Sequence, residues 1–279
     1  MSQTSIARYY DYTLPFYKIF WHKNDSNALH YGLWEKDTDN LQDALINTNR
    51  YLAKKAHITK DDTVLDVGCG IGGSSIWLVK NIGCNVVGIT ISDKQVVRAK
   101  ELAKKHGVDS KVQFFNENFT NTKFNNESFD IVWAIESVCH AIEKSDFLNE
   151  AYRILKKGGR LVLADGFLKR DPIDKNERKL LDDFCVGLEL PNMVKFLDFE
   201  KKLNASGFRD VVTEDKSDES RPSSKKLYNM CRIAYPITRI TGFLGITPKL
   251  LTLNSLAGIR QYEGGNSGLF CYGIFYAKK

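Results

Sequence analysis

The chain has 279 residues, of which 43% are apolar, 27% are charged and 11% are aromatic, and its formal net charge is +6. This composition excludes a disordered chain, a collagen and a coiled coil, and it predicts a globular protein. The longest apolar runs, at 131–135 and 268–276, are far shorter than the roughly 18 residues of a membrane span, and residues 1–11 lack the apolar core of a secretory signal. We therefore expect a cytoplasmic protein.

The first predicted elements form an amino-terminal cap over residues 1–57. Its opening stretch is rich in aromatic residues, which are Tyr9, Tyr10, Tyr12, Phe16, Tyr17, Phe20 and Trp21. Apolar residues then recur at helical spacing between Leu41 and Leu52, and this spacing predicts one amphipathic helix.

From residue 58 the sequence alternates between strand-like and helix-like segments. The first five predicted strands are 63–68, 85–91, 111–115, 129–135 and 160–165. The predicted helices between them are a segment from about Ser74, 92–106 and 145–155, the last stopped by Gly158 and Gly159. Strands at 208–214 and 269–277 bring the total to seven. The alternation predicts a doubly wound α/β fold with a mostly parallel sheet, in which residues 58–167 form the cofactor-binding core.

Two segments of the remaining part, 168–279, interrupt the alternation. Residues 168–191 are acidic and helical, whereas residues 215–265 are basic and helical. Three prolines are expected to divide the second segment, namely Pro222, Pro236 and Pro248. Both segments follow strands, and ligands of doubly wound folds bind at the carboxyl ends of the strands. We therefore expect both segments to be helical lids over a substrate and the whole chain to form one compact unit.

The positive net charge comes from one segment. Between Arg221 and Arg260 there are seven basic residues and no acidic residue. The apolar residues of this segment outnumber the basic ones, which suits a lid or a membrane-surface contact better than a track for nucleic-acid phosphates. We expect no nucleic-acid partner, and the segment 221–260 leaves a peripheral membrane contact open.

A glycine-rich turn follows the first predicted strand. Residues 64–73 read V-L-D-V-G-C-G-I-G-G, a buried strand that runs into a turn and then into a helix. Glycines let the backbone turn sharply and approach a ligand closely. The carboxylate of Asp66 beside this turn would repel a pyrophosphate but attract a ligand with an ammonium group, such as S-adenosylmethionine.

This turn, together with V-V-G-I-T-I-S at 86–92 and V-W-A-I-E-S-V-C-H-A at 132–141, resembles the class I S-adenosylmethionine-dependent methyltransferases over residues 61–166. The last two strings are similar to a branch with small-molecule acceptors, which holds sterol and tocopherol C-methyltransferases and natural-product sugar and phenol O-methyltransferases. The resemblance implies a Rossmann-like, seven-stranded sheet whose last strand is antiparallel. Because the chain lacks the longer carboxyl-terminal domain of the sterol enzymes, the resemblance does not by itself imply a sterol substrate.

The resemblance also implies which residues bind the cofactor. They are Asp66, Gly68, Gly70, Gly72, Thr90, Ile91, Gln95, Asn118, Phe119 and Glu136. Thr90 stands where many relatives have an acid that binds the ribose, so Ser92 and Gln95 are expected as substitutes. Asn118 replaces the acid that usually binds adenine, and its amide oxygen can still accept a hydrogen bond from the exocyclic amine.

His140 follows the fourth predicted strand, at the edge of the sheet where cofactor and acceptor should meet. We expect it to be the general base, with its pKa shifted from the ordinary value of about 6.5 by burial or by Asp165. Asp165 ends the fifth strand and either orients the His140 ring or caps a helix or turn. If a carbon atom is methylated, Trp133 or Tyr31 is expected to stabilise the cation that forms.

Aromatic residues before the core are predicted to line the acceptor site. Residues 30–34 read H-Y-G-L-W, which resembles a segment that helps to close the pocket in this branch. The candidate substrate-binding residues are Tyr10, Tyr31 and Trp34, with Tyr9, Tyr12 and Phe16 nearby in the same aromatic wall. The remaining histidines, which include His22, have no acidic or cysteine neighbours at metal-ligand spacing, so we expect no metal.

The sequence therefore predicts an enzyme that transfers a methyl group from S-adenosylmethionine to a hydroxyl or a carbon of a small, largely apolar metabolite. Isoprenoid, phenolic and glycosylated natural products are the expected acceptors. One alternative is a lipid-modifying enzyme of the cyclopropane-synthase type, although those enzymes usually have a glutamate where this chain has Cys139. The other alternative is a cofactor-binding module without turnover of its own. The oligomeric state is left open.

Overall fold

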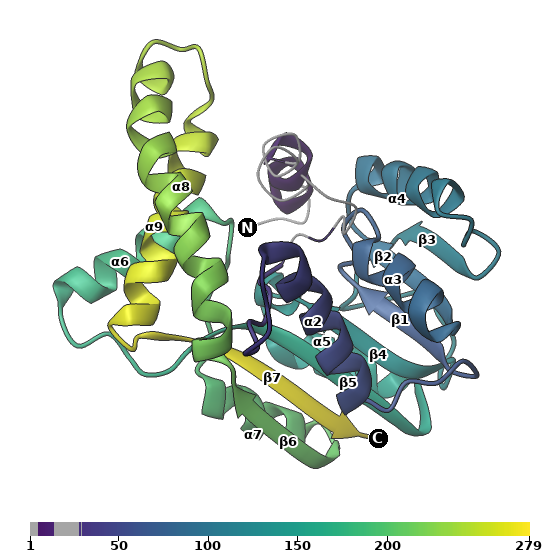
Figure 1. The fold of residues 1–279 in the computed structure, drawn as a ribbon. Helices are drawn as coiled ribbons and strands as arrows, with labels where there is room; N and C mark the ends of the chain where they lie inside the picture. Colours follow the sequence, from purple (N-terminus) through teal and green to yellow (C-terminus); the bar gives the residue numbers. More distant parts are fainter. Residues whose placement is uncertain (1–4, 14–27, 29) are drawn as a thin grey trace.

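The computed structural model describes residues 5–13, 28 and 30–279, and a seven-stranded sheet lies at its centre (Figure 1). The strands of this described part are β1 Thr63–Val67, β2 Asn85–Thr90, β3 Val112–Asn116, β4 Phe129–Ile135, β5 Leu155–Leu168, β6 Arg209–Asp215 and β7 Phe270–Lys278. Their order is β3-β2-β1-β4-β5-β7-β6, in which β7 runs antiparallel to β5 and β6 and the other neighbours are parallel. This order confirms the predicted fold class.

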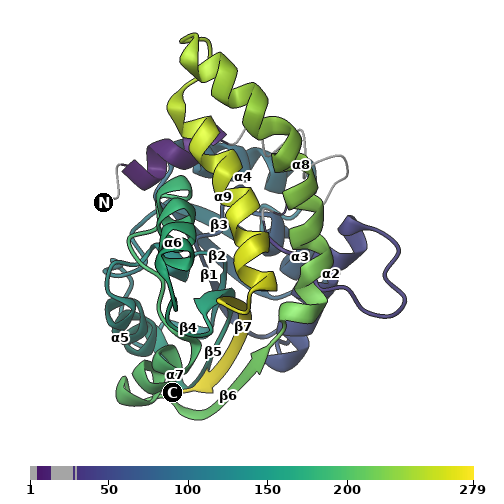
Figure 2. The same ribbon diagram turned by 90° about the vertical axis from the view of Figure 1, so that its left-hand side faces the viewer.

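Helices cover both faces of the sheet (Figures 1 and 2). They are α2 Leu41–Lys55, α3 Gly73–Ile82, α4 Asp93–Lys105, α5 Lys144–Ile154, α6 Lys175–Gly187, α7 Phe196–Ala205, α8 Ser217–Phe243 and α9 Lys249–Asn266, with the 3-10 helix η1 Val138–His140 and a helical segment at 5–13. Successive strand residues point to opposite faces, so Val64 and Trp133 join the core under α2, α3 and α4. Leu65 and Val132 join the core under α5 and α7.

Side-chain caps explain where several helices begin. The Asn40 side chain accepts hydrogen bonds from the first backbone amides of α2, and Asp174 does the same for α6. Ser92 caps α4 by accepting from the Gln95 amide at 3.1 Å. These residue types are the preferred amino-terminal caps because their short polar side chains satisfy amides that have no partner within the helix.

The start of β5 differs from the prediction. The helix expected to stop at Gly158 and Gly159 ends earlier, at Ile154, and the chain enters β5 directly at Leu155. Leu155 pairs with Phe129 in β4, but the next paired residue is Arg160, so the residues between them lie out of register. Gly158 has a φ of +74°, which an L side chain rarely adopts. The two glycines therefore form an irregularity inside a strand rather than a helix stop.

The second lid segment is divided once, not three times. Helix α8 runs unbroken through Pro222 and Pro236, and only Pro248, at the cap position of α9, separates two helices. A proline inside a helix removes a backbone hydrogen bond, and packing against another helix can compensate. That packing is close here, because a Cβ atom on Gly258 of α9 would lie 2.3 Å from the sulfur of Cys231 in α8.

Helices α8 and α9 form a hairpin whose far end projects beyond the rest of the molecule, and α6 lies beside it (Figures 1 and 2). The two predicted lid segments thus meet on one side of the sheet. No helix in the described residues is both long enough and apolar enough to cross a membrane.

Candidate active site

Two adjoining cavities lie at the carboxyl ends of the parallel strands. The first, the loop cavity, has a volume of about 100 Å³ and is lined by the glycine loop after β1, by the end of β2 and by residues of the amino-terminal segment. Eight of the ten predicted cofactor residues line it, namely Asp66, Gly68, Gly70, Thr90, Ile91, Gln95, Phe119 and Glu136. The other two, Gly72 and Asn118, are not among the lining residues.

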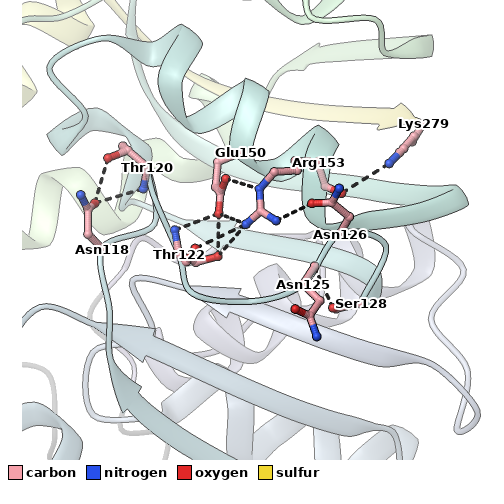
Figure 3. Close-up of polar contacts among 9 residues, drawn as sticks. All are labelled: Asn118, Thr120, Thr122, Asn125, Asn126, Ser128, Glu150, Arg153 and Lys279. Carbon is pink, nitrogen blue, oxygen red and sulfur yellow. Dashed lines mark hydrogen bonds and ion pairs between the residues drawn. The ribbon is translucent and has the colours of Figure 1, made fainter.

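Gly72 and Asn118 have other tasks in the fold. A Cβ atom on Gly72 would lie 2.7 Å from the Phe114 ring, so glycine is needed there for packing behind the loop. The Asn118 side-chain oxygen accepts hydrogen bonds from the amide and the hydroxyl of Thr120, both at 3.0 Å (Figure 3). The expected bond from Asn118 to adenine would have to compete with this turn. Farther along the same loop, the Thr122 amide donates a hydrogen bond to Glu150 of α5 at 2.8 Å (Figure 3).

The glycine loop is held so closely that side chains are excluded from it. Gly68 has a φ of +71°, and a Cβ atom there would lie 2.3 Å from the Cβ atom of Ser137. Asp66, near the end of β1, is buried and accepts a hydrogen bond from the Ser75 hydroxyl at 2.5 Å. Burial raises the pKa of Asp66 to about 6, although the bonds from Ser75 oppose this shift. A positive charge in the cavity would favour the carboxylate form.

Near the end of β2, Ser92 and Gln95 are the two residues expected to bind the ribose in place of an acid, and the structure shows which of them is better placed. The Thr90 hydroxyl donates to the side-chain oxygen of Gln95 at 2.6 Å, and both residues line the loop cavity. Ser92 does not line it, because its hydroxyl donates to Asp11 of the segment 5–13. Gln95 is therefore the better placed of the two.

His30 is a cavity residue that the sequence analysis did not assign to the cofactor. Its Nδ1 lies 2.8 Å from the Tyr31 carbonyl, which can only accept, so Nδ1 carries the proton. Its Nε2 is buried and has no hydrogen-bond partner among the described residues, and burial lowers the pKa of the ring to about 4. The neutral ring thus presents an unused acceptor beside the loop cavity. Its signal in the sequence was the H-Y-G-L-W string, which indicated only pocket closure.

The second cavity, the lid cavity, has a volume of about 340 Å³ and is largely apolar. Its roof comes from both predicted lids, through Phe184 and Leu188 near α6, Met230 and Ala234 of α8, and Leu251 of α9. None of its lining residues in the described part of the chain is a lysine or an arginine. An apolar, uncharged molecule fits these walls best.

Of the three predicted substrate-binding residues, the structure places Tyr10 and Tyr31 in the lid cavity but not Trp34. The Trp34 indole donates to the Ser223 hydroxyl at 2.9 Å and so fastens its segment to α8. Trp133 is fully buried in the core and lines neither cavity, so it cannot face a cation there. Tyr9 also lines the lid cavity, whereas Phe16 and His22 lie outside the described residues.

The two cavities share three lining residues, Tyr10, Glu136 and His140. Glu136 follows β4 with a φ of +48°, a conformation that costs a non-glycine residue about 1–3 kcal/mol. Its carboxyl accepts hydrogen bonds from the Tyr31 amide at 2.6 Å and from the Tyr272 hydroxyl at 3.0 Å. Burial, with the nearby Asp165 charge, raises the pKa of Glu136 to about 8.

His140 pairs with Tyr10 and not with Asp165. Its Nε2 lies 2.7 Å from the Tyr10 hydroxyl, and its Nδ1 lies 3.4 Å from the Glu189 carbonyl. The carbonyl can only accept, so Nδ1 carries the proton and Nε2 accepts from Tyr10. Burial lowers the pKa of His140 to about 4, well below the ordinary histidine value of about 6.5.

The Asp165 carboxylate takes the second of its two predicted roles. It accepts from the Cys139 amide at 2.9 Å and from the Gly166 amide at 2.8 Å, so it caps the turn that carries His140. Its expected bond to the His140 ring is not formed, which corrects that part of the prediction. The sequence could not show this, because both arrangements put the two residues at the same edge of the sheet.

Three successive residues of the segment 5–13 connect the parts of the site. Tyr9 accepts a hydrogen bond from Asn254 of α9, Tyr10 bonds His140, and Asp11 accepts from Ser92 after β2. The lid, the candidate base and the strand end of the loop cavity are therefore joined through one turn of helix.

Comparisons with known proteins show the family to which the chain belongs. Residues 65–163 match a family described as a methyltransferase domain. The sterol 24-C-methyltransferase of Saccharomyces cerevisiae is 32% identical over 213 residues, which are 75% of this chain and 54% of that protein. The 27-O-demethylrifamycin SV methyltransferase of Amycolatopsis mediterranei is 31% identical over 223 residues, 79% of each chain. The chain belongs to the S-adenosylmethionine-dependent methyltransferase family.

Solved structures show the same fold at lower identity. The [4+2]-cyclase SpnF has a TM-score of 0.81 and 22% identity, and the match covers 100% of this chain and 96% of that one. A geranyl diphosphate C-methyltransferase from Streptomyces coelicolor, in complex with Mg²⁺, geranyl diphosphate and S-adenosylhomocysteine, has a TM-score of 0.73 and 20% identity, covering 99% and 97%. This chain spans little more than half the length of the sterol methyltransferases that it matches.

Proposed function

We propose that the protein transfers a methyl group from S-adenosylmethionine to a hydroxyl or a carbon of a small, uncharged, largely apolar metabolite. The observation that carries this proposal is that the loop cavity and the lid cavity meet at Tyr10, Glu136 and His140. A cofactor in one cavity and an acceptor in the other would react at this junction. Methyl transfer needs mainly alignment and the exclusion of water, and an enclosed junction provides both.

The residues of the loop cavity fit the cofactor. When bound, S-adenosylmethionine supplies an electrophilic methyl group. The Asp66 carboxylate and the unused acceptor on His30 suit its ammonium group, and the Gln95 amide suits a ribose hydroxyl. The loop can pass this close to Ser137 and still line the cavity only because position 68 has no side chain.

The charges around the lid cavity favour an uncharged acceptor. Two buried carboxyl groups, those of Glu136 and Asp165, line the cavity, whereas the described residues place no lysine or arginine in it and the His140 ring is neutral. Burying an anion without a positive partner is costly, so a diphosphate such as the ligand of the Streptomyces coelicolor enzyme is disfavoured here. Among the described residues there is also no cluster of side chains that could hold a metal ion.

His140 and Tyr10 can remove the proton of a hydroxyl acceptor. Nε2 of the neutral His140 ring accepts a hydrogen bond from the Tyr10 hydroxyl, so an acceptor hydroxyl beside Tyr10 can give its proton to the Tyr10 oxygen while the Tyr10 proton moves to Nε2. If the acceptor is an alkene carbon, the same pair takes a proton from the cation after methylation. The rings of Tyr31 and Tyr272, and not Trp133, line the cavity where that cation would form.

Binding competition tests the acceptor class. A fluorescent apolar probe in the lid cavity of the cofactor-loaded protein should be displaced by a prenyl alcohol at lower concentration than by its diphosphate, because only the diphosphate brings an unpaired charge beside Glu136 and Asp165. The Ala234→Trp variant is the control for probe that binds outside the lid cavity. Its indole should fill this cavity, so neither ligand should displace probe from this variant. A diphosphate that competes better than its alcohol would contradict an uncharged acceptor.

Cofactor binding should release a proton from Glu136. With a pKa of about 8, this carboxyl is mostly protonated at pH 7, and the positive charge of the bound cofactor favours its carboxylate form. Titration calorimetry in two buffers with different heats of ionisation should therefore show release of up to about one proton per cofactor. The Glu136→Gln variant should bind without this release, whereas equal heats in both buffers for the parent protein would contradict the assignment.

A further inference from the structure

Large apolar side chains are exposed together at the end of the α8–α9 hairpin. They are Ile233, Ile237, Ile240, Phe243, Leu244 and Ile246, with 90% of Phe243 and 70% of Ile246 exposed. We call residues 233–249 the hairpin tip. This tip projects beyond the rest of the molecule in both ribbon views (Figures 1 and 2). Single exposed apolar residues are ordinary, but a cluster of this kind marks an interaction surface.

The exposed residues belong to a well-formed hairpin. Ile233, Ile237, Ile240 and Leu244 follow the spacing of one helix face, so they form a continuous stripe along α8. The turn itself is closed by hydrogen bonds, because the Ile246 amide donates to the Thr241 carbonyl at 2.8 Å. The fold thus holds these side chains out on a defined element.

Basic residues accompany the apolar stripe. Arg232, Arg239 and Lys249 are exposed in or beside the tip, and no acidic residue occurs between Arg221 and Arg260. Arg239 and Lys249 have no ion-pair partner among the described residues. Apolar side chains with unpaired cations at their flanks are complementary to a lipid surface that carries negative headgroups.

The tip is continuous with the lid cavity. Ile237 and Thr238 line that cavity, yet 55% of Ile237 is exposed to solvent. The side of α8 that roofs the cavity therefore adjoins the side that carries the exposed stripe. A molecule that leaves a bilayer at the tip would reach the cavity along apolar side chains.

We propose that the hairpin tip inserts into the surface of a bilayer that contains anionic lipids, and that the apolar acceptor enters the lid cavity from this bilayer. The first statement rests on the tip alone, and the second rests also on the proposed function. A protein partner is less well matched, because the described tip offers cations and apolar groups but no acid to pair with a partner's basic residues.

Vesicle flotation with the full chain tests the insertion. The protein should float with vesicles made of equal parts of phosphatidylcholine and phosphatidylserine, and less with phosphatidylcholine alone. The double variant Phe243→Ser, Leu244→Ser should bind these vesicles roughly a hundredfold more weakly, because each side chain loses its burial. A matched control is Ile173→Ser, Leu197→Ser, which replaces two large exposed apolar residues outside the hairpin and should bind like the parent.

Reversing the charge of two basic residues distinguishes the contribution of the lipid headgroups to binding from that of the acyl chains. Arg239→Glu with Lys249→Glu should remove most of the preference for phosphatidylserine but leave the weaker binding to phosphatidylcholine. Failure of the parent to bind either vesicle, or binding of the serine variant equal to that of the parent, would overturn the proposal. A tip-dependent dimer in sedimentation without vesicle binding would also overturn it and would make a second copy of the chain the occupant.

Cofactor affinity distinguishes failure of this inference from failure of the proposed function. Calorimetric binding of S-adenosylmethionine should be unchanged in the Phe243→Ser, Leu244→Ser variant, since neither residue lines the loop cavity. Loss of vesicle binding with unchanged cofactor binding supports insertion. If vesicle binding is as expected but no methyl group is transferred, only the origin of the acceptor fails with the proposed function.

Discussion

Replacement of His140 by alanine is expected to lower kcat by roughly 10²–10⁴-fold, the usual contribution of a positioned general base. The affinity for S-adenosylmethionine should change far less, because His140 meets the loop cavity only at the junction with the lid cavity. Single-turnover rates and calorimetric cofactor binding, measured on the same preparations, separate the two effects. A variant that keeps the parent rate would remove His140 from the mechanism and leave alignment alone as the source of catalysis.

Tyr10→Phe tests whether the proton passes through the Tyr10 hydroxyl. This variant keeps the ring and removes only the group that lies 2.7 Å from His140 Nε2, so a relay predicts a loss of rate close to that of His140→Ala. Tyr9→Phe is the matched control, since it removes a hydroxyl from the same turn of helix that bonds Asn254 instead. Rates equal to that of the parent protein in both tyrosine variants would show that the acceptor reaches His140 directly.

The pH dependence identifies the base. A histidine whose pKa is lowered to about 4 is neutral at any higher pH, so the rate attributed to His140 should be full from about pH 5 upward and should fall only through pH 4. The pKa of Glu136, about 8 before the cofactor binds, is expected to fall when the positively charged cofactor binds, but this carboxylate is still protonated at a higher pH than the His140 ring. A single-turnover rate of the cofactor-loaded enzyme that already falls between pH 8 and pH 5 would therefore assign the proton transfer to Glu136.

Gly68→Ala should weaken binding of S-adenosylmethionine by roughly 5–150-fold, which corresponds to the 1–3 kcal/mol that overpacking commonly costs. The added Cβ atom would lie 2.3 Å from the Cβ atom of Ser137, so the loop must shift. Ser137 itself is fixed, because its hydroxyl donates to the Val67 carbonyl at 2.7 Å. Calorimetry on folded protein measures the change.

Gly268→Ala provides the control for backbone strain. Gly268 has the same φ of +71° but nothing within 4 Å of an added Cβ atom, so this variant carries the conformational cost without the collision. It should bind the cofactor like the parent. If both alanine variants bind with parental affinity, the glycine loop is only a structural turn and the cofactor site lies elsewhere.

Local patterns in the sequence were sufficient to predict most of the fold. The alternation of short β-branched runs with helical spacing located β4 at residues 129–135 without error, and the other strands except β5 within one residue at each end. The secondary structure of a run such as Lys156 to Arg160 is harder to predict, because a pair of glycines can end a helix but can also lie in an irregular strand. For a related reason, the prediction that Pro222 and Pro236 divide the segment is wrong. Proline removes a hydrogen bond locally, but packing on α9 decides whether the helix continues.

The site was predictable where it depends on one segment and not where it depends on two. The loop with Asp66 and Gly68 forms within one strand-turn-helix unit, so its position follows from its own sequence. The bond between Tyr10 and His140 joins residues 130 positions apart, and no periodicity encodes such a contact. Likewise, the lack of a hydrogen-bond partner for His30 Nε2 among the described residues depends on which side chains surround the ring after folding.

The most direct test of the account is transfer of a labelled methyl group. The protein should be incubated with S-adenosylmethionine labelled in its methyl group and with an organic-solvent extract of the cells that make the protein, and the products separated by ion exchange and mass spectrometry. The account predicts that the label enters an uncharged, organic-soluble product, that His140→Ala strongly reduces this transfer, and that Ile173→Ser does not. Label that stays in the cofactor, although the protein binds it and the extract is saturating, would show a cofactor-binding module without methyl transfer and would contradict the account.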